Sequence, residues 1–89
     1  EEPVMVAFWA PQIEESITLL SELEKWLEEY GNGTRLVKID TYRNQRLVKR
    51  YAVDEIPTVL LFHKGELLSK LSGAFSPDEL KRPIEIASA

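Results

Sequence analysis

Apolar side chains recur along this chain in blocks whose spacing alternates between strand-like and helix-like. Residues 4–9 are apolar almost throughout, which is typical of a strand buried on both faces of a sheet. From about residue 13 to residue 30, apolar residues recur at helical spacing, with glutamates between them. The apolar stripe of this predicted helix consists of Ile13, Ile17, Leu20, Leu23, Leu27 and Tyr30, widened by Leu19 and Trp26. The run Gly31-Asn32-Gly33 follows, and glycine can end the helix there in the left-handed conformation.

The middle of the chain predicts three more strands and one short helix. Residues 36–39 form a second strand, and Asn44 can cap a helix that extends to about residue 51. Residues 58–62 form a third strand, which a hairpin turn joins to a fourth strand over residues 67–71.

The last segment carries strong signals for the start of a helix. Ser76 is placed to cap it, Pro77 suits the first helical position, and Glu79 completes a capping box. Pro83 lacks an N–H group and should kink or shorten this helix. Residues 1–89 therefore predict a single α/β domain with the order strand, helix, strand, helix, strand, strand, helix.

Composition narrows the classes of function. The chain has 89 residues, 44% hydrophobic and 29% charged, as in ordinary folded domains with one modest core. A net charge of −4 argues against a nucleic-acid-binding surface, which needs a basic excess. The longest apolar run, residues 58–62, is far shorter than the roughly 20 residues that cross a bilayer. We therefore expect a cytoplasmic domain that binds neither nucleic acid nor membrane.

The chain contains no cysteine and a single histidine, His63. The absence of cysteine excludes disulfides and thiolate metal sites. A single histidine in an apolar strand argues against a metal site built on histidine, which needs several ligands. We expect neither a metal nor another cofactor.

Three motifs stand at consistent separations along the chain. Phe8-Trp9-Ala10 ends the first strand, Ile56-Pro57-Thr58 opens the third, and the fourth is bracketed by Gly65 and Gly73. Together these motifs resemble the thioredoxin family over nearly the whole chain. The resemblance implies an α/β, thioredoxin-like fold: a four-stranded mixed sheet flanked by about three helices.

The chain departs from the family in three places. Ungapped alignment puts Ile13, Glu14, Glu15 and Ser16 at the family's Cys-Gly-Pro-Cys turn, and Ala7 at its buried acid. Thiol–disulfide exchange needs a thiolate and a second sulfur, so we expect a redox-inactive domain that is not an enzyme. The family's first strand and helix have no counterpart, so we expect a fold truncated at that unit.

The resemblance also implies a cis bond between Ile56 and Pro57, facing the start of the first helix. Backbone beside this proline pairs with an extended substrate peptide in the family, a form of strand addition. The expected groove consists of Trp9, Ile13, Glu14, Glu15, Ser16, Ile56, Pro57, Gly73 and Ala74. A turn that only shapes the entry to the sheet is the alternative for Pro57. Trp9 is either an exposed anchor for a partner or a half-buried residue over the helix start.

The leading hypothesis is protein–protein interaction or scaffolding through this groove, with a protein or extended peptide as partner. The alternative is a glutathione- or thiol-binding enzyme domain in which Ser16 replaces a cysteine, since glutathione transferases share this fold in their first domain. Glu14 and Glu15 would repel a bound thiolate, so capping or solvation is the favoured role for Ser16. A structural fragment or engineered minimal fold without a ligand is a third possibility.

Two surface features remain. The strand at residues 36–39 should form a sheet edge, where Leu36, Val37 and Ile39 favour weak self-association or a covering partner segment. Arg35 and Lys38 oppose it. The basic cluster of the short helix is expected to be a solvated face, with docking of an acidic partner as the alternative; it comprises Arg43, Arg46, Lys49 and Arg50.

Overall fold

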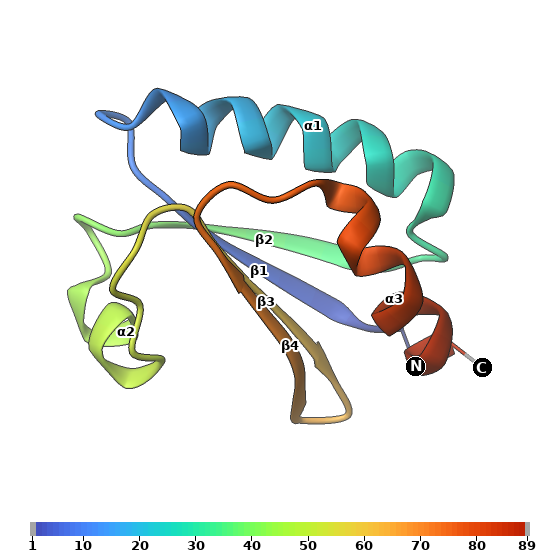
Figure 1. Ribbon diagram of the computed structural model, residues 1–89. Helices are drawn as coiled ribbons and strands as arrows, with labels where there is room; N and C mark the ends of the chain where they lie inside the picture. Colours follow the sequence, from blue (N-terminus) through green and yellow to red (C-terminus); the bar gives the residue numbers. More distant parts are fainter. Residues whose placement is uncertain (1, 89) are drawn as a thin grey trace.

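The computed structural model describes residues 2–88 as a four-stranded mixed sheet with helices on both faces (Figure 1). The strands are β1 (Val4–Trp9), β2 (Arg35–Asp40), β3 (Thr58–His63) and β4 (Glu66–Ser72). The helical segments are α1 (Glu14–Tyr30), α2 (Gln45–Arg50), a 3₁₀ turn η1 (Pro77–Leu80) and α3 (Lys81–Ser88). The strand order is β2-β1-β3-β4; β2 is parallel to β1, and the other neighbours are antiparallel. The predicted four-stranded mixed sheet with three helices is confirmed for these residues.

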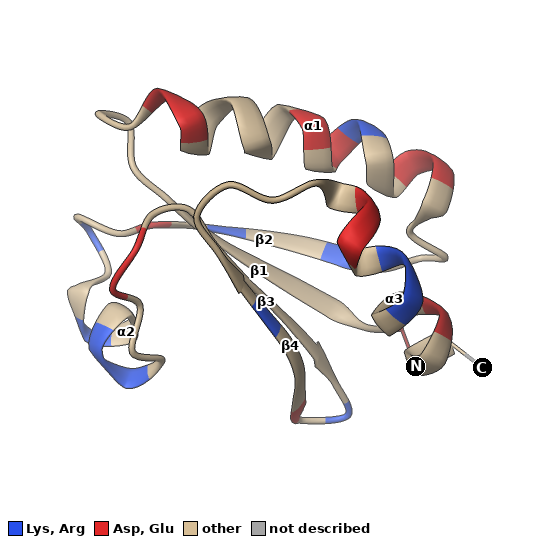
Figure 2. Cartoon of the chain, viewed as in Figure 1, with Lys and Arg blue, Asp and Glu red and all other residues tan. Residues whose placement is uncertain are grey.

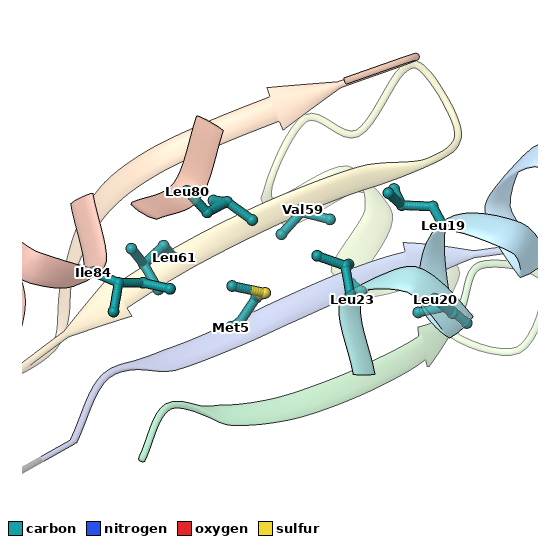
Figure 3. Packing of buried hydrophobic residues seen from close by; sticks show 9 residues of the cluster. Met5, Leu19, Leu20, Leu23, Val59, Leu61, Leu80 and Ile84 are labelled. Atoms are coloured by element: carbon teal, nitrogen blue, oxygen red, sulfur yellow. The ribbon is translucent and has the colours of Figure 1, made fainter. Parts of the chain in front are cut away.

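α1 and α3 cover one face of the sheet through the larger core cluster. Figure 3 shows Met5 of β1 and Val59 and Leu61 of β3 meeting Leu23 of α1 and Ile84 of α3, all fully buried. Alternation along the strands sends these side chains to one face. The cluster therefore fixes the height of α1 above the sheet.

Most of the predicted stripe of α1 faces the core. Leu19, Leu20 and Leu23 are buried, and Trp26 and Leu27 pack against the same cluster. The stripe was wrong at two positions, because Ile17 is 44% exposed and Tyr30 is 40% exposed. Ser16, which was not part of the stripe, is buried.

The opposite face carries a smaller core under α2. Phe8, Leu60 and Val53 are buried there, and Tyr51 packs its ring 5.7 Å from that of Phe62. This layer covers only part of the face, because α2 spans six residues. Within residues 2–88, no helix is both long and apolar enough to cross a membrane.

The run from Gly31 to Gly33 ends α1 as predicted, but the C-cap glycine is not the left-handed one. Gly31 is right-handed, with φ −76°, and the left-handed residues are Asn32 (φ 49°) and Gly33 (φ 81°). A close approach favours glycine at position 31 instead, since a Cβ there would lie 2.5 Å from the carbonyl oxygen of Leu27.

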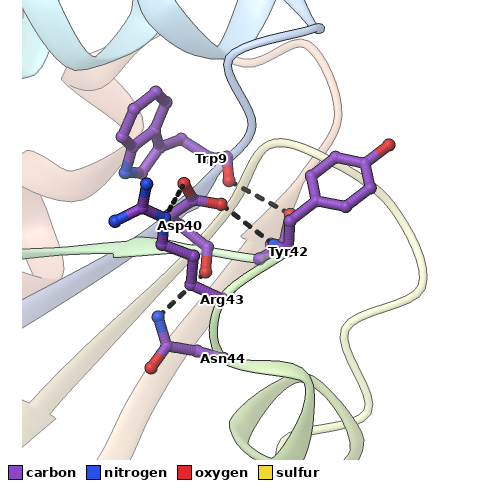
Figure 4. Close-up of polar contacts among 6 residues, drawn as sticks. Trp9, Asp40, Tyr42, Arg43 and Asn44 are labelled. Carbon is purple, nitrogen blue, oxygen red and sulfur yellow. Dashed lines mark hydrogen bonds and ion pairs between the residues drawn. The ribbon is translucent and has the colours of Figure 1, made fainter.

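Asn44 occupies the predicted cap position of α2, but its side chain does not cap the helix. Its amide donates backwards to the carbonyl of Asp40, at 2.9 Å, and the Asp40 carboxylate accepts from the Tyr42 N–H at 2.9 Å (Figure 4). These bonds fix the turn from β2 into α2, which is a different task from capping.

The start of the last helix follows the sequence closely. The capping box between Ser76 and Glu79 is present, with Pro77 at the first position. The segment begins as 3₁₀ and becomes α at Lys81, so Pro83 falls in the first turn of α3. Because N–H groups in a first helical turn lack helical partners, the proline is tolerated there.

The hairpin between β3 and β4 is also as predicted. Lys64 and Gly65, both left-handed with φ 52° and 80°, form its two-residue turn. Positive φ at both central residues is typical of a type I′ turn, whose twist matches that of the two paired strands.

β2 forms one edge of the sheet in the described residues, as expected. The N–H groups of Arg35 and Thr41 donate towards β1, to Pro3 and Trp9. The N–H and C=O groups of successive residues in a strand point to opposite neighbours. Those of Leu36 and Lys38 therefore point outward, towards the open edge of the sheet. The edge is therefore able to accept another strand.

We expect weak, concentration-dependent self-association through β2. A two-fold centred on Val37, which is 37% exposed, puts valine opposite valine and Leu36 opposite Lys38 of the second copy. A two-fold centred on Lys38 would oppose two ammonium groups and is disfavoured. Sedimentation velocity over a concentration series tests this, with Val37→Lys reducing association and Ile86→Lys, on exposed α3 surface, leaving it unchanged. A strict monomer at millimolar concentration would contradict the prediction.

Candidate functional site

A groove of about 620 Å³ opens between the start of α1 and the two loops that flank the β3–β4 hairpin. We call it the proline groove. Its lining comprises Glu14, Glu15, Thr18, Leu19, Glu22, Glu55, Ile56, Pro57, Gly73, Ala74 and Phe75. Residues far apart in sequence thus form one surface.

Pro57 lies buried at the base of this groove, after a cis bond to Ile56. Its carbonyl accepts the N–H of Gly73 at 2.8 Å, which ties the entry of β3 to the exit of β4. The buried Thr58 hydroxyl donates to the carbonyl of Glu55 at 2.6 Å and lies 3.0 Å from the Ser72 hydroxyl. The two loops are therefore held by internal bonds and need no ligand to position them.

Backbone conformation favours glycine at position 73. Its φ of +74° is left-handed, a conformation that residues with a side chain rarely adopt. The Glu55 carboxylate rests across this glycine: a Cβ at position 73 would lie 2.6 Å from one of its oxygens, so the exposed Glu55 side chain would have to move aside. Both residues line the groove.

The backbone of Ile56 is open to a ligand. Within residues 2–88, its N–H and C=O make no hydrogen bond to another backbone group. Ile56 is only partly buried and lines the groove. An extended peptide laid beside it can pair with both groups, as in strand addition.

The charge of the groove is of one sign. Its lining includes four carboxylates, those of Glu14, Glu15, Glu22 and Glu55, and no lysine or arginine. Figure 2 shows acidic residues at the start of α1, while the basic residues of α2 lie in a separate part of the molecule.

Six of the nine predicted site residues line the groove: Glu14, Glu15, Ile56, Pro57, Gly73 and Ala74. Trp9, Ile13 and Ser16 do not. Five further lining residues were not predicted: Thr18, Leu19, Glu22, Glu55 and Phe75. Helical spacing was a usable signal for two of them, because residues 14, 18 and 22 recur at intervals of four along one face.

Ser16 has a different role from the expected capping or solvation. Its side chain is fully buried, and its hydroxyl accepts the N–H of Ala10 at 3.1 Å. The hydroxyl hydrogen lies within reach of two carbonyl oxygens, of Ile13 at 2.7 Å and Ala10 at 3.0 Å. Ser16 therefore fastens the loop between β1 and α1. A thiol ligand would need this hydroxyl to be accessible, and the geometry does not support that.

Trp9 is half-buried and packs against the α1–α3 core cluster, as in the second of its two interpretations. Its carbonyl accepts the N–H of Thr41 at 3.0 Å, next to the Asp40 and Arg43 side chains (Figure 4). Trp9 thus connects β1 to the end of β2, outside the groove.

The groove offers binding groups and lacks the groups for thiol chemistry. Ala7, at the position of the family's buried acid, is 2% exposed within the core. Among residues 2–88, no three histidine, aspartate or glutamate side chains are grouped so as to hold a metal ion.

Comparisons with known proteins agree with the fold. The family model described as thioredoxin matches residues 1–86. The chain is 30% identical to the chloroplastic thioredoxin Y of Oryza sativa subsp. japonica, over 98% of this chain and 52% of that protein. It is 33% identical to a thioredoxin of Pyropia yezoensis, over 81% of this chain and 67% of that protein. The chain thus spans about half the length of the rice relative.

Solved structures show the same arrangement of elements. A mutant thioredoxin from Halobacterium salinarum NRC-1 superposes with a TM-score of 0.86 at 29% identity, over all of this chain and 77% of that one. Mitochondrial thioredoxin 3 from Saccharomyces cerevisiae, in its oxidized form, gives 0.82 at 26% identity, over 97% and 79% of the two chains. The thioredoxin-like α/β fold is therefore shared with both.

The role of Ser16 can be tested by removing its hydroxyl. Ser16→Ala leaves the buried N–H of Ala10 without its partner, so we expect a loss of about 1–3 kcal/mol in the free energy of unfolding, measured with urea. Ser21→Ala, an exposed change on the same helix, should stay within about 0.5 kcal/mol of the parent. Equal, small effects of both substitutions would show that the Ser16 bonds do not hold the loop.

Proposed function

We propose, because this chain belongs to the thioredoxin family and contains no cysteine, that it is a redox-inactive binding domain. In this proposal the proline groove holds an extended segment of a protein partner without turnover. The observation that carries the proposal is a contrast between two parts of the site. The open backbone of Ile56 remains beside the buried Pro57, while Ile13 and Ser16 stand at the two cysteine positions.

The groove supports binding through two kinds of contact. Main-chain pairing to Ile56 supplies affinity that is independent of sequence, and the apolar surfaces of Leu19 and Phe75 offer contact to side chains. The bonds of Pro57 and Thr58 already hold the loops of the groove, so binding costs little entropy for ordering the protein. A short peptide buries little surface, so we expect a dissociation constant on the order of 100 μM.

Catalysis of thiol–disulfide exchange is excluded from the proposal on chemical grounds. The attacking species is a thiolate, and the intermediate is a mixed disulfide, so both steps need sulfur. The glutathione-binding alternative gains no support from the buried, hydrogen-bonded Ser16.

The chain should reduce insulin disulfides no faster than buffer with dithiothreitol alone. Replacing both turn residues, Ile13→Cys with Ser16→Cys, should restore only weak activity. Glu14 and Glu15 between the new thiols disfavour a thiolate, and Ala7 supplies no acid for proton transfer. Turnover in the double variant equal to that of an ordinary thioredoxin, measured by the same turbidity assay, would contradict this account of the site.

Binding in the groove can be measured by NMR with a neutral extended peptide of the pattern Gln-Thr-Gln-Val-Gln-Thr-Gln. We expect amide shifts confined to the groove, centred on Ile56 and Ala74. Thr18→Tyr fills the groove from the exposed side of α1 and should weaken binding at least about fivefold, or roughly 1 kcal/mol. Ser21→Tyr, exposed on the same helix but outside the groove lining, is the control.

Two other results are informative. Shifts spread over the surface, or equal effects of the two tyrosine variants, would refute binding in the groove. Saturable binding of glutathione with shifts at residues 13–16 would favour the thiol-binding alternative.

A further inference from the structure

We infer that the segment bound in the proline groove is basic, with lysine or arginine at alternate positions of an extended chain. The inference rests on the proposed function and adds the chemistry of the partner. The shape of the groove and the open backbone of Ile56 allow an extended segment to bind. The charge of the groove selects the side chains of that segment.

The carboxylates stand on both walls of the groove. Glu14, Glu15 and Glu22 come from α1, and Glu55 comes from the loop on the far side of Pro57. All four side chains are exposed, so each can turn towards a ligand. A strand lying along Ile56 sends alternate side chains to its two sides. Basic side chains therefore meet carboxylates whichever wall they face.

The charges of the groove are not neutralised from within. The two ion pairs between lysine or arginine and a carboxylate in residues 2–88 join Lys38 to Glu24 and Arg43 to Asp40. Neither uses a carboxylate of the groove lining. A neutral or acidic segment would leave four like charges around one open groove, whereas a cationic segment relieves their repulsion.

Glu55 places one of these charges next to the pairing site. The Glu55 carboxylate rests across Gly73. Glu55 also directly precedes Ile56, whose backbone N–H and C=O are open. A lysine beside the paired residue of a ligand would therefore meet this carboxylate without changing the main-chain contact. Selection for positive charge and strand addition act together here.

The magnitude of selection follows from the exposure of these groups. Exposed ion pairs contribute little each, on the order of a 1.4- to fivefold gain in affinity. Two or three such pairs give roughly tenfold between a lysine and a neutral side chain. Salt screens them, so most of the difference should vanish at about 1 M, where the Debye length is about 3 Å.

The test compares three acetylated, amidated peptides of the pattern Xaa-Thr-Xaa-Val-Xaa-Thr-Xaa, with Xaa as lysine, glutamine or glutamate. NMR titration at low salt should rank their affinities lysine, glutamine, glutamate, with about tenfold between the first two. If the glutamine peptide binds in the groove and the lysine peptide binds no better, the inference fails and the proposed function stands. If no peptide binds, both fail.

A charge-neutralised variant supplies the matched control. Replacing Glu14, Glu15, Glu22 and Glu55 together by glutamine should abolish the preference for lysine while the glutamine peptide still binds. The same number of exposed carboxylates is removed outside the groove lining by glutamine at Glu28, Glu29, Glu66 and Glu85. That control should keep the preference. An equal loss in both variants would show that only net charge matters and would overturn the inference.

A second copy of this chain is the competing occupant, because α2 presents Arg46, Lys49 and Arg50 as an exposed basic face. If α2 of another molecule occupies the groove, sedimentation should show salt-sensitive association that Arg50→Glu abolishes and the lysine peptide reverses. Such a result would show that the groove binds a second copy of this chain, and it would contradict the inference that the groove binds an extended basic segment of another protein.

Discussion

β1 and β3 pair antiparallel at the centre of the sheet, and both helical layers pack on side chains that this pair supplies. Met5 and Val59 face α1, while Phe8 and Leu60 face α2. The antiparallel register also places the end of β1 next to the start of β3, because Phe8 pairs with Thr58. The loop that leads into α1 leaves the sheet at this point. The proline groove lies where those two ends meet, so its existence depends on that pairing.

A fold can present a groove without carrying the reactive groups that its family uses there. In this chain a fully buried serine hydroxyl holds the loop before α1 by hydrogen bonds to the main chain. The backbone of Ile56 keeps its open donor and acceptor. Function resides in a site and not in a fold, so membership of the thioredoxin family is compatible with binding alone.

The distribution of charge says more about this molecule than its net charge of −4 does. Carboxylates line the groove, and the basic residues of α2 lie on the opposite face of the sheet from α1 (Figure 2). Fields of this kind act mainly on specificity and the rate of encounter, while packing and main-chain pairing supply affinity. Discrimination between partners is accordingly expected to respond to salt.

The sequence by itself determined the elements, their order and the thioredoxin-like fold, because periodicity, turn chemistry and the Ile56-Pro57 motif are local signals. The capping box at Ser76 was readable for the same reason. Only the tertiary structure decided the limits of the buried face of α1, since they depend on where the sheet lies. It buried Ser16, and it placed Glu22 and Glu55 in the lining of one groove. These two glutamates are more than thirty residues apart in sequence, and no local pattern places them in one site.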